Sequence, residues 1–186
     1  MVGSESRAPW ISTRLGTGKY VLDIGCRDGT LTNKYAASNT VVGVDIDAEA
    51  LRLAKANYGF ETHQINLNNG SLPFPDSSFD AVIAGEVLEH LQFPDTAVID
   101  IHRVLKPAVT FIGSVPNAFR LRNRLDFLLG REFEKDPTHL HHFSPAGLKR
   151  LLAGFRDVEL DFLESRYRWF SKRLMATQMM FAAQKS

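Results

Sequence analysis

The stretch "KYVLDIGCRDGT", residues 19–30, runs from apolar side chains directly into a polar turn that contains two glycines. Its first seven residues have the length and composition of a buried strand, and Gly25 and Gly29 permit a tight turn close to a ligand. The next segment, 30–37, is predicted to be a helix whose first N–H groups would face a carboxylate or a phosphate. Such turns also join strands to helices without any ligand, so the function needs further signals.

Strand and helix patterns alternate along the rest of the chain, which predicts a mostly parallel sheet with covering helices. Further strands are expected at 40–47, 61–67, 80–85 and 109–115, and helices at 48–58, 94–106 and 145–153. Two last strands, near 156–165 and 175–183, have a connection short enough for an antiparallel pair. We therefore predict a doubly wound α/β sheet of seven strands, mostly parallel, with an antiparallel C-terminal strand.

The composition of the 186 residues fits one compact soluble domain with a short flexible start. The 22 basic and 21 acidic side chains nearly balance, so no broad field gathers nucleic acid or an anionic membrane. The single cysteine, Cys26, excludes an intramolecular disulfide and a cysteine-based zinc site and suits the cytoplasm. We expect no signal peptide and no membrane span, because no stretch approaches roughly 20 apolar residues.

Polar residues follow the predicted strands at one edge of the sheet, which is where open α/β sheets bind ligands. Asp45 follows the second strand, and its carboxylate suits the two hydroxyls of a ribose, although it could also cap the next helix. Asn66 and Leu67 follow the third strand and would offer an amide and an apolar wall to a flat base. These separate signals converge on one ligand site.

The fourth strand runs without a break into "GEVLEH", residues 85–90. Glu86 and Val87 are expected to border the same crevice. We expect the acids of this segment to lie at the rim, where water and ligand solvate them, rather than in the core. Glu86 and Glu89 could instead favour the start of a helix, and His90 could be an ordinary structural histidine.

A polar and aromatic insert, residues 117–143, interrupts the alternation after the fifth strand. Because it leaves the same edge of the sheet, we expect it to cover a bound substrate. Its His139, His141 and His142 are the candidates for a catalytic general base. They could instead pack in a turn or cap the following helix, and because their spacing alone does not bring the rings together, we predict no metal site.

Four segments, taken together and in order, resemble the class I S-adenosylmethionine-dependent methyltransferases, a broad group that includes C- and O-methyltransferases of quinone biosynthesis. They are "VLDIGCRDGTLT" (21–32), "VVGVDID" (41–47), "LPFPDSSFDAVIAGEVLEHL" (72–91) and "HRVLKP" (102–107). The resemblance covers about residues 19–160. It implies a Rossmann-like fold with helices on both faces of the sheet and S-adenosyl-L-methionine as cofactor, and it says little about the substrate.

The resemblance also implies which residues bind the cofactor, with one group after each strand. They are Asp23, Gly25, Cys26, Arg27 and Gly29 after the first strand, Asp45 and Ile46 after the second, Asn66 and Leu67 after the third, and Glu86 and Val87 after the fourth. The first and last groups would surround the methionine part. The second would hold the ribose hydroxyls and lie on the adenine, which the third would border.

Two of these positions depart from the family pattern. Arg27 stands where glycine is usual, and a side chain costs roughly 1–2 kcal/mol there if the backbone needs a positive φ. Its guanidinium could instead reach the carboxylate of the cofactor. Asn66 stands where the family commonly has Asp.

We therefore expect an enzyme that transfers the methyl group of S-adenosylmethionine to a small-molecule acceptor by in-line displacement. The alternative is a methyltransferase-like binding subunit with weak or no catalysis. A nicotinamide-dependent oxidoreductase is disfavoured, because its G-x-G-x-x-G turn is replaced here by G-x-x-x-G. Nucleic-acid methylation is disfavoured as well, because "AGEV" (84–87) stands where base methyltransferases of this fold place an Asx-Pro-Pro-aromatic tetrapeptide. The acceptor, the atom methylated and the oligomeric state are not specified.

Overall fold

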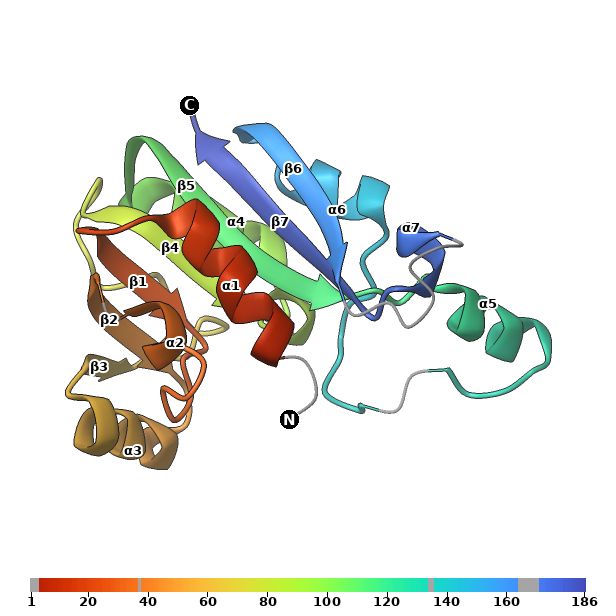
Figure 1. Ribbon diagram of the computed structural model, residues 1–186, viewed down its shortest axis with the longest axis horizontal. Coiled ribbons are helices and arrows are strands. Elements are labelled where there is room, and N and C mark those ends of the chain that lie inside the picture. Colours follow the sequence, from red (N-terminus) through yellow and green to blue (C-terminus); the bar gives the residue numbers. More distant parts are fainter. Residues whose placement is uncertain (1–3, 37, 134–135, 164–170) are drawn as a thin grey trace.

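The computed structural model describes residues 4–36, 38–133, 136–163 and 171–186 (Figure 1). Its strands are β1 (Tyr20–Ile24), β2 (Thr40–Asp45), β3 (Glu61–Gln64), β4 (Phe79–Gly85), β5 (Leu105–Pro116), β6 (Phe155–Leu163) and β7 (Gln178–Lys185). They form one sheet in the order β3-β2-β1-β4-β5-β7-β6. Strands β1 to β5 are parallel, and β7 runs antiparallel between β5 and β6. The predicted seven-stranded, doubly wound sheet is therefore confirmed.

Helices cover both faces of this sheet (Figure 1). They are α1 (Ser4–Leu15), α2 (Asn33–Ala36), α3 (Ala48–Tyr58), α4 (Pro94–Val104), α5 (Leu121–Leu128), α6 (Pro145–Leu151) and α7 (Lys172–Met175), with a 3-10 helix, η1 (Leu88–His90), after β4. Within the described part of the chain, none of the helices combines the length and the apolar character that crossing a membrane requires.

Two apolar cores lie on opposite faces of the sheet, because successive side chains of a strand alternate. On one face, Leu22 of β1 belongs to a core that includes Ile101 of α4 and Leu148 of α6. On the other face, Val21 belongs to a core with Trp10 of α1. The central strands are thus buried on both sides, which explains why they read as nearly continuous apolar runs.

Helix α3 shows how local sequence sets an element that borders the site. The carboxylate of Asp47 accepts hydrogen bonds from the N–H groups of Glu49 and Ala50, at 3.0 and 3.1 Å. At the other end, Gly59 adopts φ 73°, a conformation that glycine reaches at little cost. The helix therefore begins just after the end of β2, as the sequence predicts.

The N-terminal segment differs from the flexible start that we expected. From Ser4 onward it forms α1, which buries Trp10, Ile11 and Leu15 against the sheet. The indole N–H of Trp10 also donates to Asp161 of β6, at 3.1 Å. The expectation was wrong because the apolar residues of α1 find partners on strands that are distant in sequence.

Several element bounds also differ from the prediction. Helix α2 has only four residues, so it does not offer the helical N-terminus that we expected for an anion. Strand β3 ends at Gln64, before the predicted 67, and β5 already begins at Leu105, where the predicted helix 94–106 would continue. The ammonium of Lys185 donates to the Leu105 carbonyl at 2.6 Å, which ties the early start of β5 to the last strand. Residue 37 and residues 164–165 of the predicted elements lie outside the described residues.

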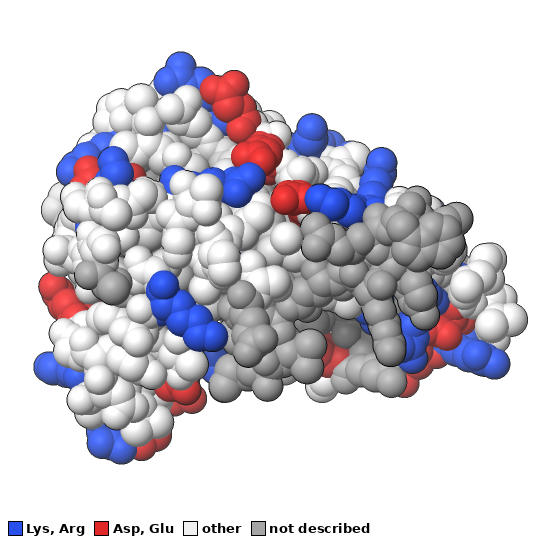
Figure 2. Space-filling model, in the orientation of Figure 1, with Lys and Arg blue, Asp and Glu red and all other residues white. Residues whose placement is uncertain are grey.

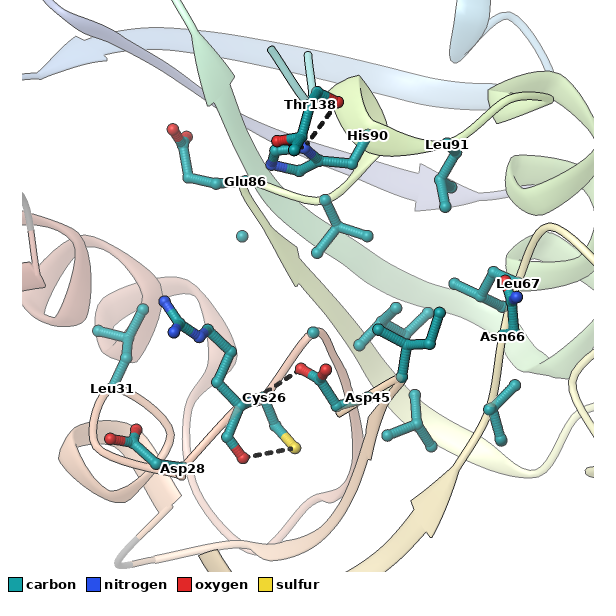
Figure 3. Close-up of a pocket in the computed structure, with 18 of the residues that line it drawn as sticks. Cys26, Asp28, Leu31, Asp45, Asn66, Leu67, Glu86, His90, Leu91 and Thr138 are labelled. Atoms are coloured by element: carbon teal, nitrogen blue, oxygen red, sulfur yellow. Dashed lines mark hydrogen bonds between the residues drawn. The ribbon is translucent and has the colours of Figure 1, made fainter. Parts of the chain in front are cut away.

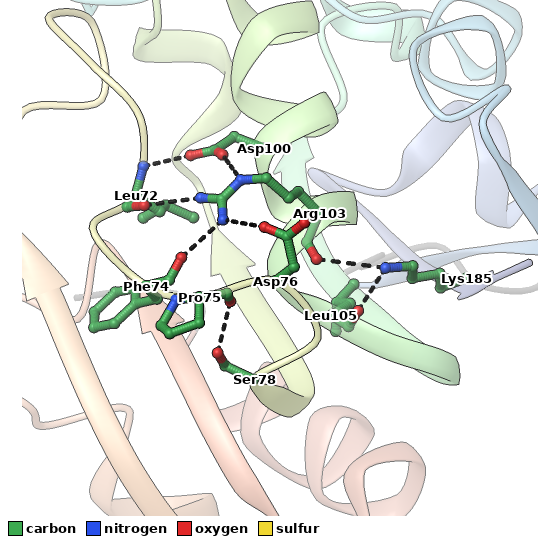
Figure 4. A network of polar contacts seen from close by, with 9 residues as sticks. All are labelled: Leu72, Phe74, Pro75, Asp76, Ser78, Asp100, Arg103, Leu105 and Lys185. Atoms are coloured by element: carbon green, nitrogen blue, oxygen red, sulfur yellow. Dashed lines mark hydrogen bonds and ion pairs between the residues drawn. The ribbon is translucent and has the colours of Figure 1, made fainter.

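A polar network around Arg103 fastens α4 to the loop before β4 (Figure 4). The guanidinium donates to Asp100 at 2.7 Å and to Asp76 at 2.8 Å, and to the carbonyls of Leu72 and Phe74, both at 2.8 Å. Because the planar guanidinium has several donors in fixed directions, one side chain satisfies all four acceptors. This network lies away from the edge of the sheet where the strand ends gather.

Replacing Arg103 with alanine should destabilise the protein by about 2–3 kcal/mol, because two partly buried carbonyls and the Asp100 carboxylate lose their donor. Lys106→Ala is the control, since Lys106 forms a single, partly exposed ion pair with Asp80, and it should cost less than about 1 kcal/mol. Urea unfolding measures both values. Equal losses for the two variants would show that the network contributes no more than a surface pair.

Candidate active site

The carboxyl ends of β1, β2 and β4 open into one cavity of about 760 Å³ (Figure 3). Nine of the eleven predicted cofactor-binding residues line it: Gly25, Cys26, Arg27, Asp45, Ile46, Asn66, Leu67, Glu86 and Val87. Arg7 of α1 and Asp136 and Thr138 of the insert line it as well. Strand order and connection length therefore bring together residues that are up to 131 positions apart.

The turn after β1 lies against β4 with no room for a side chain. Gly25 has φ 74°, and a β-carbon there would lie 2.4 Å from Cγ2 of Val87. Its N–H donates to the Val44 carbonyl at 2.8 Å, which ties the turn to the end of β2. Gly25 thus keeps the cavity open between the first and fourth strands.

Asp45 ends β2 with its carboxylate at the cavity wall. One oxygen accepts a hydrogen bond from the Arg27 N–H at 2.8 Å, and the other accepts from the Asp47 N–H at 3.0 Å. Each carboxylate oxygen has a further lone pair, so the oriented group can still accept two hydroxyls. The arrangement fits the predicted role as a ribose ligand.

The side of the cavity assigned to the base combines apolar and amide groups. Ile46 follows Asp45 and has 59% of its surface exposed, so its apolar side chain is accessible to a ligand. The Asn66 side chain accepts from the Asn68 N–H at 3.0 Å, which shapes the loop after β3. Ile46, Asn66 and Leu67 therefore line the cavity as a flat base would require.

Asp23 and Gly29 do not line the cavity. Asp23 is 3% exposed and points under α2, where the hydroxyls of Thr32 and Tyr35 both donate to its Oδ2. A β-carbon at Gly29 would lie 2.9 Å from the rings of Tyr58 and Phe60. Both residues thus support the loop on the side that faces away from the cavity. Their contact with a cofactor stays a prediction.

Cys26 lines the cavity with a thiol that is unsuited to nucleophilic catalysis. Burial is the main cause that raises the pKa of this thiol, and the nearby carboxylates of Asp23 and Asp45 raise it further. The thiolate is the nucleophilic form of cysteine. Cys26 therefore serves to fill space, and a β-carbon at Gly43 would lie only 2.6 Å from its sulfur.

The acids after β4 lie deeper than the rim position that we expected. Glu89 is only 1% exposed, and Oε1 of Glu86 is buried as well. Burial, and then the charge of Glu86, raise the pKa of Glu89 to about 9. Burial also raises the pKa of Glu86, and Ser114 and the positive charge of Arg7 oppose that rise. The expectation failed because the insert, distant in sequence, packs over η1.

The insert is fastened to η1 beside the cavity. The N–H groups of Leu140 and His141 donate to the Glu89 carbonyl at 2.8 and 3.1 Å. Nδ1 of His90 lies 3.1 Å from the Thr138 carbonyl and 3.0 Å from the Thr138 hydroxyl (Figure 3). The second half of the insert thus forms part of the cavity wall.

The three histidines of the insert lie in different places. The His139 ring lies beside that of His90, with the ring centroids 4.8 Å apart. The ring of His141 stacks on Phe143, and the ring of His142 lies against Phe133. None of the three lines the main cavity. His139 lies near it through its contact with His90, and it lines a separate pocket with residues of α5. A catalytic role for any of the three stays a prediction.

Sequence reasoning gave His90 and Glu89 no role and did not consider Arg7. The motif "GEVLEH" contained the signal for the first two, but only the packing of the insert makes them neighbours of His139. Arg7 lies in α1, which was not predicted.

Comparisons with known proteins agree with this geometry. Residues 22–113 match a family described as a methyltransferase domain. A probable S-adenosylmethionine-dependent methyltransferase from Mycolicibacterium smegmatis is 33% identical over 144 residues, which covers 74% of this chain and 52% of the relative. A demethylmenaquinone methyltransferase from Tropheryma whipplei is 37% identical over 92 residues, 48% of this chain and 38% of the relative.

A solved structure has the same fold across almost the whole chain. A SAM dependent methyltransferase from Archaeoglobus fulgidus aligns with a TM-score of 0.76 and 20% identity, over 98% of this chain and 95% of its own. The chain belongs to the class I S-adenosylmethionine-dependent methyltransferases. The expected family, its fold and its methyl donor, S-adenosylmethionine, are therefore confirmed. The chain spans about half the length of the relatives it matches first.

Arg27 has φ 48°, so the condition for backbone strain at this position is met. Arg27→Gly should be more stable than Arg27→Ala by about 1 kcal/mol. Only glycine removes the β-carbon that is strained at this φ, and this gain exceeds the loss from the greater freedom of glycine in the unfolded chain. Urea unfolding measures the difference. Calorimetry of the same variants tests the arginine itself: tighter cofactor binding by Arg27→Gly than by the parent protein would contradict a contact between the guanidinium and the cofactor.

Asp23 provides a pH-dependent test. Burial, opposed by the hydroxyls of Thr32 and Tyr35, raises its pKa from 3.8 to about 6. The folded state therefore keeps the proton longer than the unfolded state, and stability should fall as pH rises from about 4 to 6, by up to about 3 kcal/mol.

Asp23→Asn should lack this loss, since the amide oxygen can still accept both hydroxyls and carries no charge. Unfolding free energies of the parent and the variant, measured from pH 4 to 7, check the prediction. Parallel pH profiles would show that Asp23 does not titrate in this range.

Proposed function

We propose that this chain transfers the methyl group of S-adenosylmethionine to a small-molecule acceptor. The observation that supports this most is that Gly25, Asp45, Asn66 and Glu86, each following a different strand, line one cavity. When bound, S-adenosylmethionine supplies a methyl group on an activated sulfonium, so that transfer is an in-line displacement. The protein then needs mainly to align the acceptor and exclude water, and orientation can contribute about 7–11 kcal/mol.

The residues present fit the cofactor. Asp45 has lone pairs left for the ribose hydroxyls, and Ile46 presents an exposed apolar surface to the adenine. Gly25 keeps the methionine end free of a side chain. Arg7 and Glu86, which line the same end of the cavity, would hold the carboxylate and the ammonium of the methionine part.

The insert is proposed to cover the acceptor. Its residues Asp136 and Thr138 already line the cavity, and α5 extends from the same edge of the sheet (Figure 1). Of the three predicted base candidates, His139 is the one whose position supports the role, because its ring lies beside His90 at the cavity wall. A base is required only if the acceptor must lose a proton.

The face of the molecule seen in Figure 2 does not favour a nucleic-acid acceptor. On the face seen in Figure 2, basic and acidic side chains of the described residues are interspersed rather than gathered in a basic stripe. Neutralising several phosphates requires such a stripe. A small molecule in the cavity is the better supported acceptor.

A binding subunit with weak or no catalysis is the second candidate. The observation in its favour is the strained Arg27 in the cofactor turn. Fold alone does not decide between catalysis and binding.

Calorimetric titration with S-adenosylmethionine and S-adenosylhomocysteine tests the proposal. Asp45→Ala should weaken binding at least about 100-fold, because two charge-assisted hydrogen bonds to the ribose are lost. Asp47→Ala is the matched control: it removes a carboxylate two positions away, and the α3 cap with it, but Asp47 does not line the cavity.

The control should keep its affinity while losing about 1 kcal/mol of stability. NAD should not bind to any of the proteins. If the parent protein binds neither sulfur compound, the methyltransferase proposal fails. If both compounds bind but no acceptor is methylated in a screen with labelled methyl groups, the binding-subunit alternative gains support.

A further inference from the structure

Three metal-ligating side chains converge at the wall of the cavity. Glu89, His90 and His139 each place one ligand atom within 4.8 Å of the other two. Two of them belong to η1 and the third to the insert. Because the N–H groups of Leu140 and His141 both donate to the Glu89 carbonyl, main-chain hydrogen bonds hold the third ligand in place.

The carboxylate of Glu89 is buried without a hydrogen-bond donor among the described residues. The residue is 1% exposed, and among the described residues neither of its oxygens has a hydrogen-bond donor. Oε1 of Glu86, three residues earlier, is likewise buried without one. Buried carboxylates are normally paired with a cation or bound to a metal, because an unpaired charge is costly in a protein interior.

The hydrogen bond of His90 prepares one ring nitrogen as a ligand. Nδ1 lies 3.1 Å from the Thr138 carbonyl, and a carbonyl can only accept. A hydrogen bond to this carbonyl requires the tautomer with the proton on Nδ1, which leaves Nε2 available to a metal ion. Metal-bound histidines generally donate their other ring N–H to a carbonyl or a carboxylate in this way. Figure 3 shows His90 held by Thr138 at the cavity.

We propose that Glu89, His90 and His139 bind a divalent cation of the Mn²⁺, Co²⁺ or Zn²⁺ type, which in turn binds a hydroxyl of the acceptor. Two imidazoles and one carboxylate suit first-row transition ions better than Mg²⁺ or Ca²⁺, which prefer oxygen ligands. Three protein ligands leave coordination positions open. This replaces the expectation of no metal, which rested on histidine spacing and could not include Glu89 and His90.

The cation would explain how an acceptor hydroxyl loses its proton. Because His90 lines the cavity, an ion held by these three residues would lie at the cavity wall, where it could bind an acceptor hydroxyl. Binding to a divalent cation lowers the pKa of a hydroxyl, so that its proton can leave to water near neutral pH. This role rests on the proposed function and narrows the acceptor to a hydroxyl compound. The cation site itself does not rest on it.

Titration of the chelator-treated full chain with Mn²⁺, followed by the electron paramagnetic resonance of free Mn²⁺, tests the site. The parent protein should bind one Mn²⁺. Glu89→Gln and His139→Gln should each weaken binding at least about 10-fold. His141→Gln is the matched control, because His141 lies two residues from His139 but stacks on Phe143, and it should bind like the parent protein.

The Glu89→Gln variant also distinguishes loss of the metal ligand from loss of folding. Glutamine keeps the shape of the side chain and carries no charge that would need a partner in the protein interior, so the variant should unfold at the same temperature as the metal-free parent or a higher one. Failure of the parent protein to bind Mn²⁺, Co²⁺ or Zn²⁺ would overturn the proposal. So would undiminished binding by Glu89→Gln, or an equal loss in His141→Gln.

A parallel titration separates this proposal from the proposed function. S-adenosylhomocysteine binding is measured by calorimetry in the presence of chelator, and it should be the same in the parent protein and Glu89→Gln. If Mn²⁺ binds but S-adenosylhomocysteine does not, the methyltransferase proposal fails and the cation site stands. For the acceptor role, catechol should shift the visible bands of the Co²⁺-loaded parent protein, and an unchanged spectrum would refute that role.

Discussion

The reversal of strand order between β1 and β4 is the constraint on which the rest of this structure depends. The chain builds outward from β1 to β2 and β3, and then returns to place β4 on the other side of β1. Connections that leave two neighbouring parallel strands in opposite directions leave a crevice above their carboxyl ends. Gly25 keeps that crevice open, because a β-carbon there would overlap with Val87.

The chemistry of the site comes from parts added to this central arrangement. Strand ends contribute carboxylates, including Asp45 and Glu86, while the groups that can balance them come from elsewhere. Arg7 comes from the N-terminal helix, and His139 comes from the insert after β5. The sheet thus sets where a ligand lies, and α1 and the insert set the charge around it. Relatives of the same fold can differ in substrate for this reason.

Among the described residues, positive φ angles at non-glycine positions occur both at the cavity and away from it, at Ser77, Ala108 and Asp157. Arg27 and Glu86, which both line the cavity, have φ values of 48° and 58°. Non-glycine residues in this region cost free energy and persist only where the surrounding structure holds them. Arg103 stabilises the connection between α4 and β4, and neither it nor its partners line the cavity.

The sequence by itself determined the sheet and its mostly parallel direction, and nine of the eleven cofactor-binding residues predicted from it line the cavity. These follow from local patterns, because an apolar run that ends in Gly25 or Asp45 predicts a buried strand followed by a polar turn, whatever the position of that strand in the sheet. Only the tertiary structure decided the burial of Glu89, the pairing of His90 with His139 and the helix that carries Arg7. Each of these depends on segments far apart in the chain, and no local pattern encodes which distant surface a helix or an insert will cover.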